Sequence, residues 1–446
     1  MTKRTIFHVD VNSAFLSWSA LKHLAENPGS VDLRTIPSAV GGDVKTRHGI
    51  ITAKSIPAKK YGIQTGEPVV KALQKCPGLV LVPPDFATYR KYSHALMGIL
   101  FEFSPVLQQV SIDEAFLDMT DSIPPGDRGR ALITAQEIRD RVRTELGFTV
   151  NVGISSNKLL AKMASDFQKP DRTHTLYPEE VPQKMWPLPI GELYGCGKQT
   201  AQKLKLVGIN TIGDAAAADP ALIQSLLGQK SGSYILAAAN GISSSPVVPE
   251  REQAKSVSNE RTLAEDIGRD NFQTDAVPVI RELSQKVAGR MQKSGLIGQT
   301  VTLQVKSSEF QRYSRQMALP EPTDQAGQIE SAALDLAERL LTGPEGLFAE
   351  GMSIRLIGVG VSRIAEKQVR RLHQMDIFEW VSSNQEEEET AKRTKEELTK
   401  KAEAEKRRSE KQRSEKQEKL DSMMEKINRR YGDGTLEKGC VLKDEE

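Results

Sequence analysis

The alternation of apolar and polar positions divides the chain into units of strands and helices. Near the amino terminus, the apolar run at residues 5–9 predicts a buried strand that delivers Asp10 at its end, just before a helical pattern over residues 13–24. Further strands are predicted at 39–42, 50–53, 106–110 and 148–153, and helices at 69–75 and 131–146. This order predicts an α+β sheet domain with a small subdomain inserted near its front.

The remainder of the chain changes character three times. Residues 169–239 show helical patterns with glycine-rich corners, and residues 255–364 follow the order strand, helix, strand, strand, helix, strand. Between them, residues 241–253 have the serine, proline and charge content of an exposed linker. Beyond residue 382, a run rich in Glu, Lys, Arg and Gln predicts a solvated helix or a disordered arm. We therefore expect a multidomain α+β protein.

Composition and charge narrow the class of protein only slightly. The 446 residues carry 61 basic and 59 acidic side chains, so the net charge of +2 says little about partners. Since there is no apolar leader and no run of about 18 apolar residues, we expect neither secretion nor a membrane span. Cys76, Cys196 and Cys440 are scattered without metal-ligand spacing, which favours the reducing cytoplasm.

Two acidic segments are candidates for a metal site. Asp113 and Glu114 follow the strand predicted at 106–110, and at a tight hairpin both side chains can turn toward one site that Asp10 could complete. Oxygen ligands from several elements suit Mg²⁺ rather than zinc, and a pair of such ions catalyses nucleotidyl transfer. For an isolated Asp-Glu pair, a solvated turn is the alternative.

The wider pattern around these segments resembles a known family. DVNSAF (10–15) and SIDEAFLD (111–118) are accompanied, in order along the chain, by AVGGD, KYGI, VPPDFATYRKYS, GISSNKLLAKMASDFQKPD, LYGCGKQTAQKLKLVGINTIGD and KSVSNERT. Over residues 4–365 the chain resembles the Y-family of DNA polymerases, the DinB/UmuC translesion group, in the DNA polymerase IV-like form of Gram-positive bacteria. Ordered matches over this length rarely arise by chance.

The resemblance implies a right-hand polymerase. Its parts are expected as a palm at 1–25 and 76–168, fingers at 26–75, a helical thumb with a helix-hairpin-helix at 169–240, a linker at 241–254, an α/β little finger at 255–366, a clamp-binding segment at 367–380 and a charged tail at 381–446. It also implies two Mg²⁺ ions held by Asp10, Asp113 and Glu114, with the Val11 carbonyl as a further ligand.

The same resemblance assigns residues around the incoming nucleotide. Phe15 stands where the family has a bulky aromatic that excludes a ribose 2′-hydroxyl, with simple packing in the core as the alternative. Lys169 stands at the lysine that holds the triphosphate, with an ordinary surface lysine as the alternative. In the fingers, Ile56 and Lys59 replace the family's usual Tyr and Arg, so the bidentate grip is lost and Lys54 becomes a possible substitute.

Residues for DNA and clamp contacts follow from the later segments. Gly195, Gly197 and Gly208 resemble the helix-hairpin-helix glycines whose N–H groups approach a phosphate, although most such glycines are ordinary turns. In the little finger, basic residues would track phosphates: Arg261, Lys306, Arg312 and Arg315. The segment QMDIF resembles the sliding-clamp pentapeptide, with anchors at Gln374, Ile377 and Phe378.

The resemblance thus implies a template-directed, low-fidelity DNA polymerase that bypasses lesions. Its expected partners are primer-template DNA, deoxynucleoside triphosphates and the sliding clamp (β subunit), and we expect a cytoplasmic monomer. The alternative is a weak or inactive accessory protein that binds DNA and recruits the clamp. Retention of Asp10, Asp113 and Glu114 favours the enzyme, whereas Ile56 and Lys59 keep the alternative open.

Overall fold

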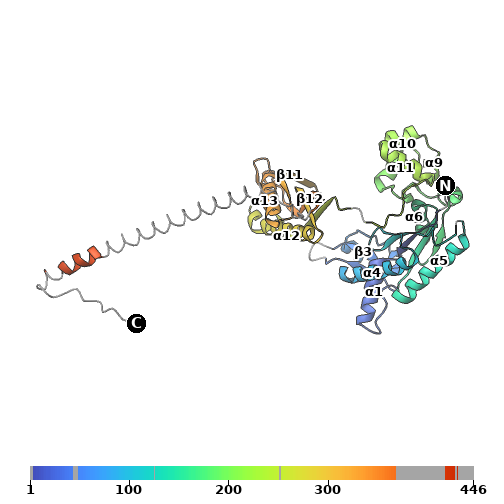
Figure 1. Ribbon diagram of the computed structural model, residues 1–446, viewed down its shortest axis with the longest axis horizontal. Helices are drawn as coiled ribbons and strands as arrows, with labels where there is room; N and C mark the ends of the chain where they lie inside the picture. Colours follow the sequence, from blue (N-terminus) through green and yellow to red (C-terminus); the bar gives the residue numbers. More distant parts are fainter. Residues whose placement is uncertain are drawn as a thin grey trace, which may run out of the picture. The chain divides into compact units, whose positions relative to one another are not determined.

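The computed structural model describes residues 4–43, 49–124, 126–250, 253–367, 417–426 and 429 (Figure 1). The chain divides into two compact units, Met1–Glu366 and Lys367–Glu446. In the second unit, residues 417–426 form a helix. Most of the predicted charged tail and nearly all of the predicted clamp-binding segment lie outside the described residues.

A five-stranded sheet organises the first part of the chain. Its order is β5 (Leu107–Gln109), β6 (Glu114–Asp118), β1 (Ile6–Val11), β7 (Val150–Ser155) and β8 (Thr173–Thr175). Neighbours are antiparallel except β7 and β8. Because side chains alternate along a strand, Phe7, Val9 and Val11 of β1 enter one core, while His8 and Asp10 project from the opposite face.

Helices cover both faces of this sheet. The core side receives apolar residues from three helices, α1 (Ala14–Glu26), α4 (Phe86–Phe103) and α5 (Arg128–Arg141). On the other side, α6 (Lys158–Asp166) packs against β1 and β7. Gly153 of β7 permits this close approach, since a Cβ there would lie 2.0 Å from the carbonyl oxygen of Ala161. The polar side chains of β1 therefore face α6 at short range.

A smaller sheet forms the unit expected as fingers. Its order is β3 (Ile51–Lys54), β2 (Ser38–Gly41) and β4 (Val80–Val82), and it carries α2 (Ile56–Lys59) and α3 (Val69–Lys75). Strand β4 pairs in parallel with β2. The boundary expected after residue 75 therefore falls inside this unit, because its third strand completes the sheet only at Val82.

Short helices make up the next part of the chain, as the glycine-rich helical pattern predicts. They are α7 (Val181–Lys184), α8 (Lys198–Leu206), α9 (Ile212–Ala217), α10 (Pro220–Leu227) and α11 (Gln229–Ala239), joined by 3₁₀ turns at Pro178–Glu180 and Ile190–Glu192. Leu193, Leu204 and Ile235 lie in their shared core. The start expected at residue 169 is too early, because β8 belongs to the five-stranded sheet.

The segment expected as an exposed linker is anchored at its centre. Val247 is only 7% exposed and packs with Phe116 of β6 in a small apolar cluster. The Gln108 side chain accepts the Val248 N–H at 3.2 Å and the Lys158 ammonium at 2.7 Å. Burial of the Val247 side chain thus anchors this segment, although its composition alone predicts an exposed linker.

The carboxyl-terminal domain has the predicted order of strand, helix, strand, strand, helix, strand. Its antiparallel sheet runs β11 (Arg312–Thr323), β10 (Leu296–Ser307), β12 (Ile354–Glu366) and β9 (Ser256–Ile267). Val301, Leu303 and Val305 of β10 point into the core with α12 (Val277–Lys293) and α13 (Ala326–Ala337). The alternate positions, Lys306 among them, form an open face of the sheet, directed away from both helices.

Within the described ranges, no helix is both long enough and apolar enough to span a bilayer.

Candidate active site

Strand register brings two of the predicted carboxylates together. Asp10 of β1 lies opposite Glu114 of β6, and residues paired across strands project from the same face. Both carboxylates therefore meet α6. Asp113 lies one residue before β6, and its carbonyl oxygen accepts the Val11 N–H at 3.1 Å. The backbone thus fastens the two acidic segments to each other.

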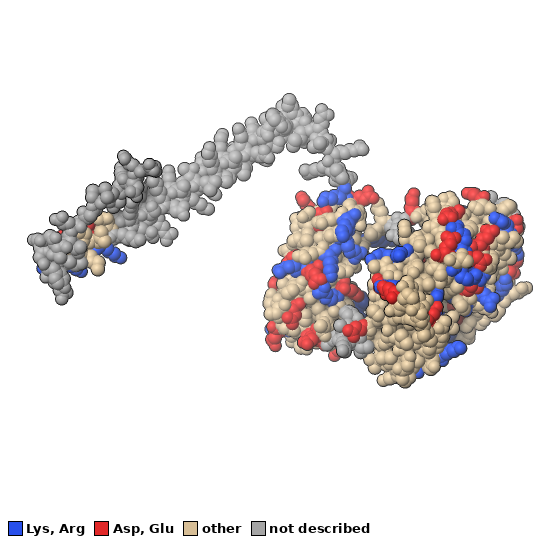
Figure 2. Space-filling model, turned by 90° about the horizontal axis from the view of Figure 1, so that it is seen from below, with Lys and Arg blue, Asp and Glu red and all other residues tan. Residues whose placement is uncertain are grey.

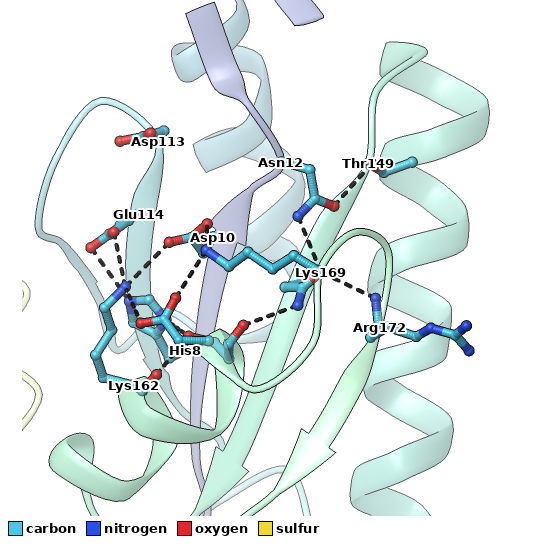
Figure 3. A network of polar contacts seen from close by, with 12 residues as sticks. His8, Asp10, Asn12, Asp113, Glu114, Thr149, Lys162, Lys169 and Arg172 are labelled. Carbon is cyan, nitrogen blue, oxygen red and sulfur yellow. Dashed lines mark hydrogen bonds and ion pairs between the residues drawn. The ribbon is translucent and has the colours of Figure 1, made fainter. Parts of the chain in front are cut away.

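Two lysines close over these carboxylates (Figure 3). The Lys162 ammonium donates to Asp10 Oδ2 at 3.2 Å and to Glu114 Oε1 at 3.0 Å. The Lys169 ammonium donates to Asp10 Oδ1 at 2.7 Å. Asp166 lies within 3.3 Å of Lys162 and 2.9 Å of Lys169. The result is an alternating network of two ammonium groups and three carboxylates.

Lys162 is a site residue that the sequence reasoning missed. Every residue of α6 from 159 to 165 is buried, and Lys162 itself is 8% exposed. A lysine in an otherwise apolar stretch was the available signal, because lysine is almost never fully buried unless it is paired.

His8 is a second residue that was not predicted. Its ring is fully buried, with Nδ1 2.8 Å from Ser165 Oγ and Nε2 3.6 Å from Glu114 Oε2. Burial lowers the pKa of His8, so the imidazole is neutral at neutral pH. It forms an uncharged wall beside the Glu114 carboxylate.

Burial and neighbouring groups shift the two carboxylates in opposite directions. Burial raises the pKa of Asp10 to about 6, although the Lys169 and Lys162 ammonium groups oppose this shift. The His8 imidazole, together with Asp10 and Lys162, holds the pKa of Glu114 well below its usual range. The buried Asp10 carboxylate therefore depends on nearby cations to remain charged.

The acidic residues fit Mg²⁺ in their chemistry but are not gathered into one cluster. Among the described residues, no group of three or more Asp, Glu, His or Cys side chains is placed to hold a metal ion. Asp113 accepts the Ser111 hydroxyl at 2.6 Å and lines a neighbouring cavity, apart from the Lys162 network. Still, carboxylates from adjacent strands are the hard oxygen donors that Mg²⁺ requires, and Asp10 already attracts two cationic groups.

A cavity of about 640 Å³ brings together the residues predicted to surround the incoming nucleotide. Its lining includes Val11, Phe15, Lys54, Ile56, Lys59, Asp113 and Lys169. Phe15 is half-buried and stacks on Tyr89, with ring centroids 4.6 Å apart and planes 15° apart. The Phe15 ring therefore both packs on the core and borders the cavity.

The two lysines from the fingers differ in their surroundings. Lys54 is half-buried and donates to Thr65 Oγ1 at 3.2 Å, whereas Lys59 is exposed. Burial, followed by the charge of Lys59, lowers the pKa of Lys54. Ile56 is 46% exposed and presents an apolar surface where the family usually has a tyrosine. Lys54 is thus a better fixed cation than Lys59.

The three predicted glycines of the helical unit have different roles. Gly195 and Gly208 adopt φ of +85°, and Gly197 is the residue that precedes α8. A Cβ at Gly195 would lie 2.5 Å from the Tyr234 ring, whereas Gly197 and Gly208 have nothing within 4 Å of that position. Gly195 is therefore required for packing, and only Gly197 and Gly208 leave space for a partner.

The structure separates the four basic residues predicted in the carboxyl-terminal domain. Lys306 and Arg312 are cross-strand neighbours on the open face of the sheet. Arg261 pairs with Glu282 of α12, on the helix side. Arg315 lies opposite the buried Leu303 and so projects toward the same side as Arg261. Gln374, Ile377 and Phe378, predicted to bind the clamp, lie outside the described residues.

Known proteins and family models match nearly the whole length of the chain. Family models match at residues 9–166 (impB/mucB/samB family), 178–209 (IMS family HHH motif) and 254–376 (impB/mucB/samB family C-terminal domain). DNA polymerase IV of Clostridium acetobutylicum is 36% identical over 445 residues, covering 99% of each chain. The chain belongs to the DNA polymerase IV family. DNA polymerase IV 1 of Bacillus subtilis is also 36% identical, covering 99% of this chain and 94% of that protein.

The comparison with solved structures concerns the fold. A Y-family DNA polymerase chimera matches with a TM-score of 0.70 and 23% identity, covering 81% of this chain and 99% of that chain. The predicted α+β right-hand fold is confirmed. As a family member along its entire length, the chain is a DNA-directed DNA polymerase of the translesion class, and such polymerases depend on divalent metal ions.

Proposed function

We propose that this polymerase holds two Mg²⁺ ions with Asp10, Asp113 and Glu114, with the Val11 carbonyl as a further ligand. When bound, the ions would polarise the α-phosphate, lower the pKa of the primer 3′-hydroxyl and neutralise the leaving pyrophosphate. The observation that carries this proposal is the pairing of Asp10 with Glu114 beside the cavity that Asp113 lines. Lys162 would keep Asp10 and Glu114 charged before the ions bind.

The cavity beside these carboxylates would receive the deoxynucleoside triphosphate. Lys169 borders it and contacts Asp10, so its ammonium can hold the phosphates next to the metal site. Lys54 and Lys59 line the same cavity from the fingers. We assign the main contact from the fingers to Lys54, since it is half-buried and held by Thr65. Phe15 would exclude a 2′-hydroxyl, because its ring is fixed by stacking on Tyr89.

Two surfaces are proposed to bind primer-template DNA independently of sequence. Gly197 and Gly208 leave open space for a phosphate to reach the backbone N–H groups. On the open sheet face, Lys306 and Arg312 lie near a shallow cavity of about 260 Å³, whose lining includes Ser258, Gly358 and Gly360. Small side chains let a DNA backbone approach the sheet closely. Arg261 and Arg315 project from the other side, so we expect them to contribute less.

A clamp contact is proposed for the segment that contains Gln374, Ile377 and Phe378, from its sequence alone. Replacing all three by alanine is expected to abolish binding to the sliding clamp in a pull-down while basal primer extension continues. Clamp affinity retained by the triple variant would remove the assignment. We further propose a cytoplasmic monomer, in keeping with the buried free thiols of Cys76 and Cys196.

Primer extension tests the catalytic proposal. Wild-type protein and the Asp113→Ala/Glu114→Ala variant are compared with Mg²⁺ on an undamaged template and on one with an abasic site. The variant is expected to bind the primer-template normally, as measured by fluorescence anisotropy, but to extend neither template. Undiminished extension by the variant would refute the metal site.

A further inference from the structure

An exposed aromatic ring stands at the tip of the β10–β11 hairpin. Phe310 is 61% exposed, and its backbone has φ of +68°. Left-handed backbone is rare for a bulky aromatic residue and costs free energy that the surrounding structure must offset. The left-handed backbone at Phe310 destabilises the folded state, and the exposed ring buries too little apolar surface to offset this. The position of the ring is therefore better explained by binding than by stability.

Hydrogen bonds hold this tip in one conformation. The Ser307 N–H donates to the Gln311 carbonyl at 2.8 Å, and the Phe310 N–H donates to the Ser307 carbonyl at 2.9 Å. The Ser308 N–H donates across to the Ser353 carbonyl, next to β12, at 3.0 Å. The ring is therefore carried on a braced turn, so little conformational freedom is lost when something binds to it.

Two cations lie close to the ring. The Arg355 guanidinium carbon lies 4.0 Å from the ring centroid of Phe310, and the Lys306 ammonium lies 5.5 Å from it. Arg312, the cross-strand neighbour of Lys306, extends this basic group along the open face. Figure 2 shows Lys and Arg side chains gathered in a band on this domain. The ion pairs in the described part of the domain use other cations: Arg261, Arg281, Lys286 and Arg339.

We propose that Phe310, with Arg355 and Lys306 beside it, forms a stacking platform for an unpaired base of single-stranded DNA. Proteins that bind single strands combine cations for the phosphates with aromatic faces on which bases stack, and a guanidinium against the ring adds a cation–π contribution. In a primer-template, the single-stranded part is the template overhang. The platform thus binds the template strand beyond the duplex. This role depends on the DNA contact that is proposed above for the open face of the sheet.

The chemistry of the surroundings favours a base over a protein side chain. An apolar partner would have to be buried beside Lys306, Arg312 and Arg355, which would desolvate their charges. A DNA strand instead supplies phosphates for the cations and a base for the ring. Glu309 is the one acidic residue of the turn at 307–311, so the net charge of this group remains positive.

Equilibrium binding of the full-length protein tests the platform. Anisotropy is measured on a duplex with a single-stranded template overhang, on the same duplex with an abasic overhang, and on a blunt duplex. Phe310→Ala and Phe310→Leu are expected to weaken binding to the normal overhang by between about 5-fold and 100-fold, with Phe310→Tyr close to wild type. Loss of the bases from the overhang is expected to lower wild-type affinity to the level of Phe310→Ala.

The controls separate this inference from the general DNA contact. Blunt-duplex affinity is expected to fall in Lys306→Ala/Arg312→Ala but not in Phe310→Ala. Phe310→Gly is expected to melt no earlier than wild type, because glycine accepts the left-handed backbone, while it loses the overhang preference. Equal loss on blunt and overhang DNA, full affinity of Phe310→Leu, or insensitivity to abasic sites would each overturn the platform while leaving the polymerase assignment intact.

Discussion

Replacing Lys162 by methionine would expose how far the acidic site depends on its own cations. Methionine keeps the length and apolar stem of the side chain but removes the ammonium that bridges Asp10 Oδ2, Glu114 Oε1 and Asp166 Oδ2 at 3.2, 3.0 and 3.3 Å. Asp10 is 6% exposed, so its carboxylate cannot gain hydration in place of the lost partner. We expect the variant to fold but to be less stable.

The size of the effect follows from the contacts that remain. Removing one member of a buried ion pair costs about 3–5 kcal/mol of unfolding free energy. Lys169 still contacts Asp10 at 2.7 Å, so we expect the lower end of that range. For a domain of roughly 150–250 residues, a loss of about 3 kcal/mol in unfolding free energy corresponds to a fall of roughly 6–12 °C in Tm.

The loss of stability caused by Lys162→Met should depend on pH in a defined direction. Asp10 has a folded-state pKa of about 6, above its unfolded value of 3.8, so the folded protein holds a proton that the unfolded chain has released. Stability due to this group is present at low pH and is lost as pH rises through 6. Without the Lys162 ammonium, the pKa of Asp10 rises further. The part of the stability deficit that comes from Asp10 should therefore be small at pH 5 and largest near pH 8, whereas the part that comes from Glu114, whose pKa lies well below this range, should change little between these pH values.

Melting curves in EDTA and in Mg²⁺ provide the assay. A metal ion that binds only the folded state adds stability, about 2.7 kcal/mol at 100 times its Kd. The vacated carboxylates should bind Mg²⁺ more tightly, so the gap between variant and wild type is expected to narrow in Mg²⁺. Lys158→Met on the same helix is the matched control, since among the described residues Lys158 donates to the neutral oxygens of Gln108 and Pro246 and to no carboxylate. A Tm of Lys162→Met within about 2 °C of wild type in EDTA, or no response of this Tm to Mg²⁺, would show that Lys162 does not stabilise the acidic site.

Three further changes probe the cavity and the linker. Phe15→Ala is expected to raise ribonucleotide incorporation by about 10-fold or more in single-nucleotide insertion assays, and an unchanged ratio would exclude the gate. Lys54→Ala is expected to raise the apparent KM for nucleotide by about 10-fold, because a charge-assisted contact to the triphosphate is lost. Lys59→Arg is expected to lower the apparent KM, because a guanidinium can form the bidentate contact that an ammonium cannot. Unaltered KM values in steady-state insertion would show that other residues of the fingers bind the triphosphate. Val247→Asp should accelerate limited proteolysis of the linker, and equal digestion would contradict its anchoring.

The sequence predicted the structure best where a chemically distinctive residue lies at the end of a segment with clear hydrophobic periodicity. The strand that ends near Asp10, the hairpin at Asp113 and Glu114 and the order of the carboxyl-terminal domain follow from local alternation. Strands β4 and β8 were missed, because each has three residues and gains its place only through parallel pairing with a distant strand. Such pairing leaves no periodic signal in so short a segment.

Side-chain direction was the other limit. Arg261 and Arg315 looked equivalent to Lys306 and Arg312, yet a shift of one residue along a strand moves a side chain to the other face. Which face is open depends on where the helices pack. Lys162 was missed for a related reason, since only the packing of α6 against β1 reveals that its amine meets Asp10.

The assignment of Asp10 to the metal site is tested by measuring insertion of a single nucleotide by the Asp10→Asn variant. Asparagine preserves the size of the side chain but removes the charge that Lys162, Lys169 and the proposed Mg²⁺ ions share. With primer-template and nucleotide saturating, and DNA affinity measured on the same sample, we predict a single-turnover rate at least about 100-fold below wild type with an unchanged Kd for DNA. A rate close to that of wild type would contradict the assignment of Asp10 to the metal site.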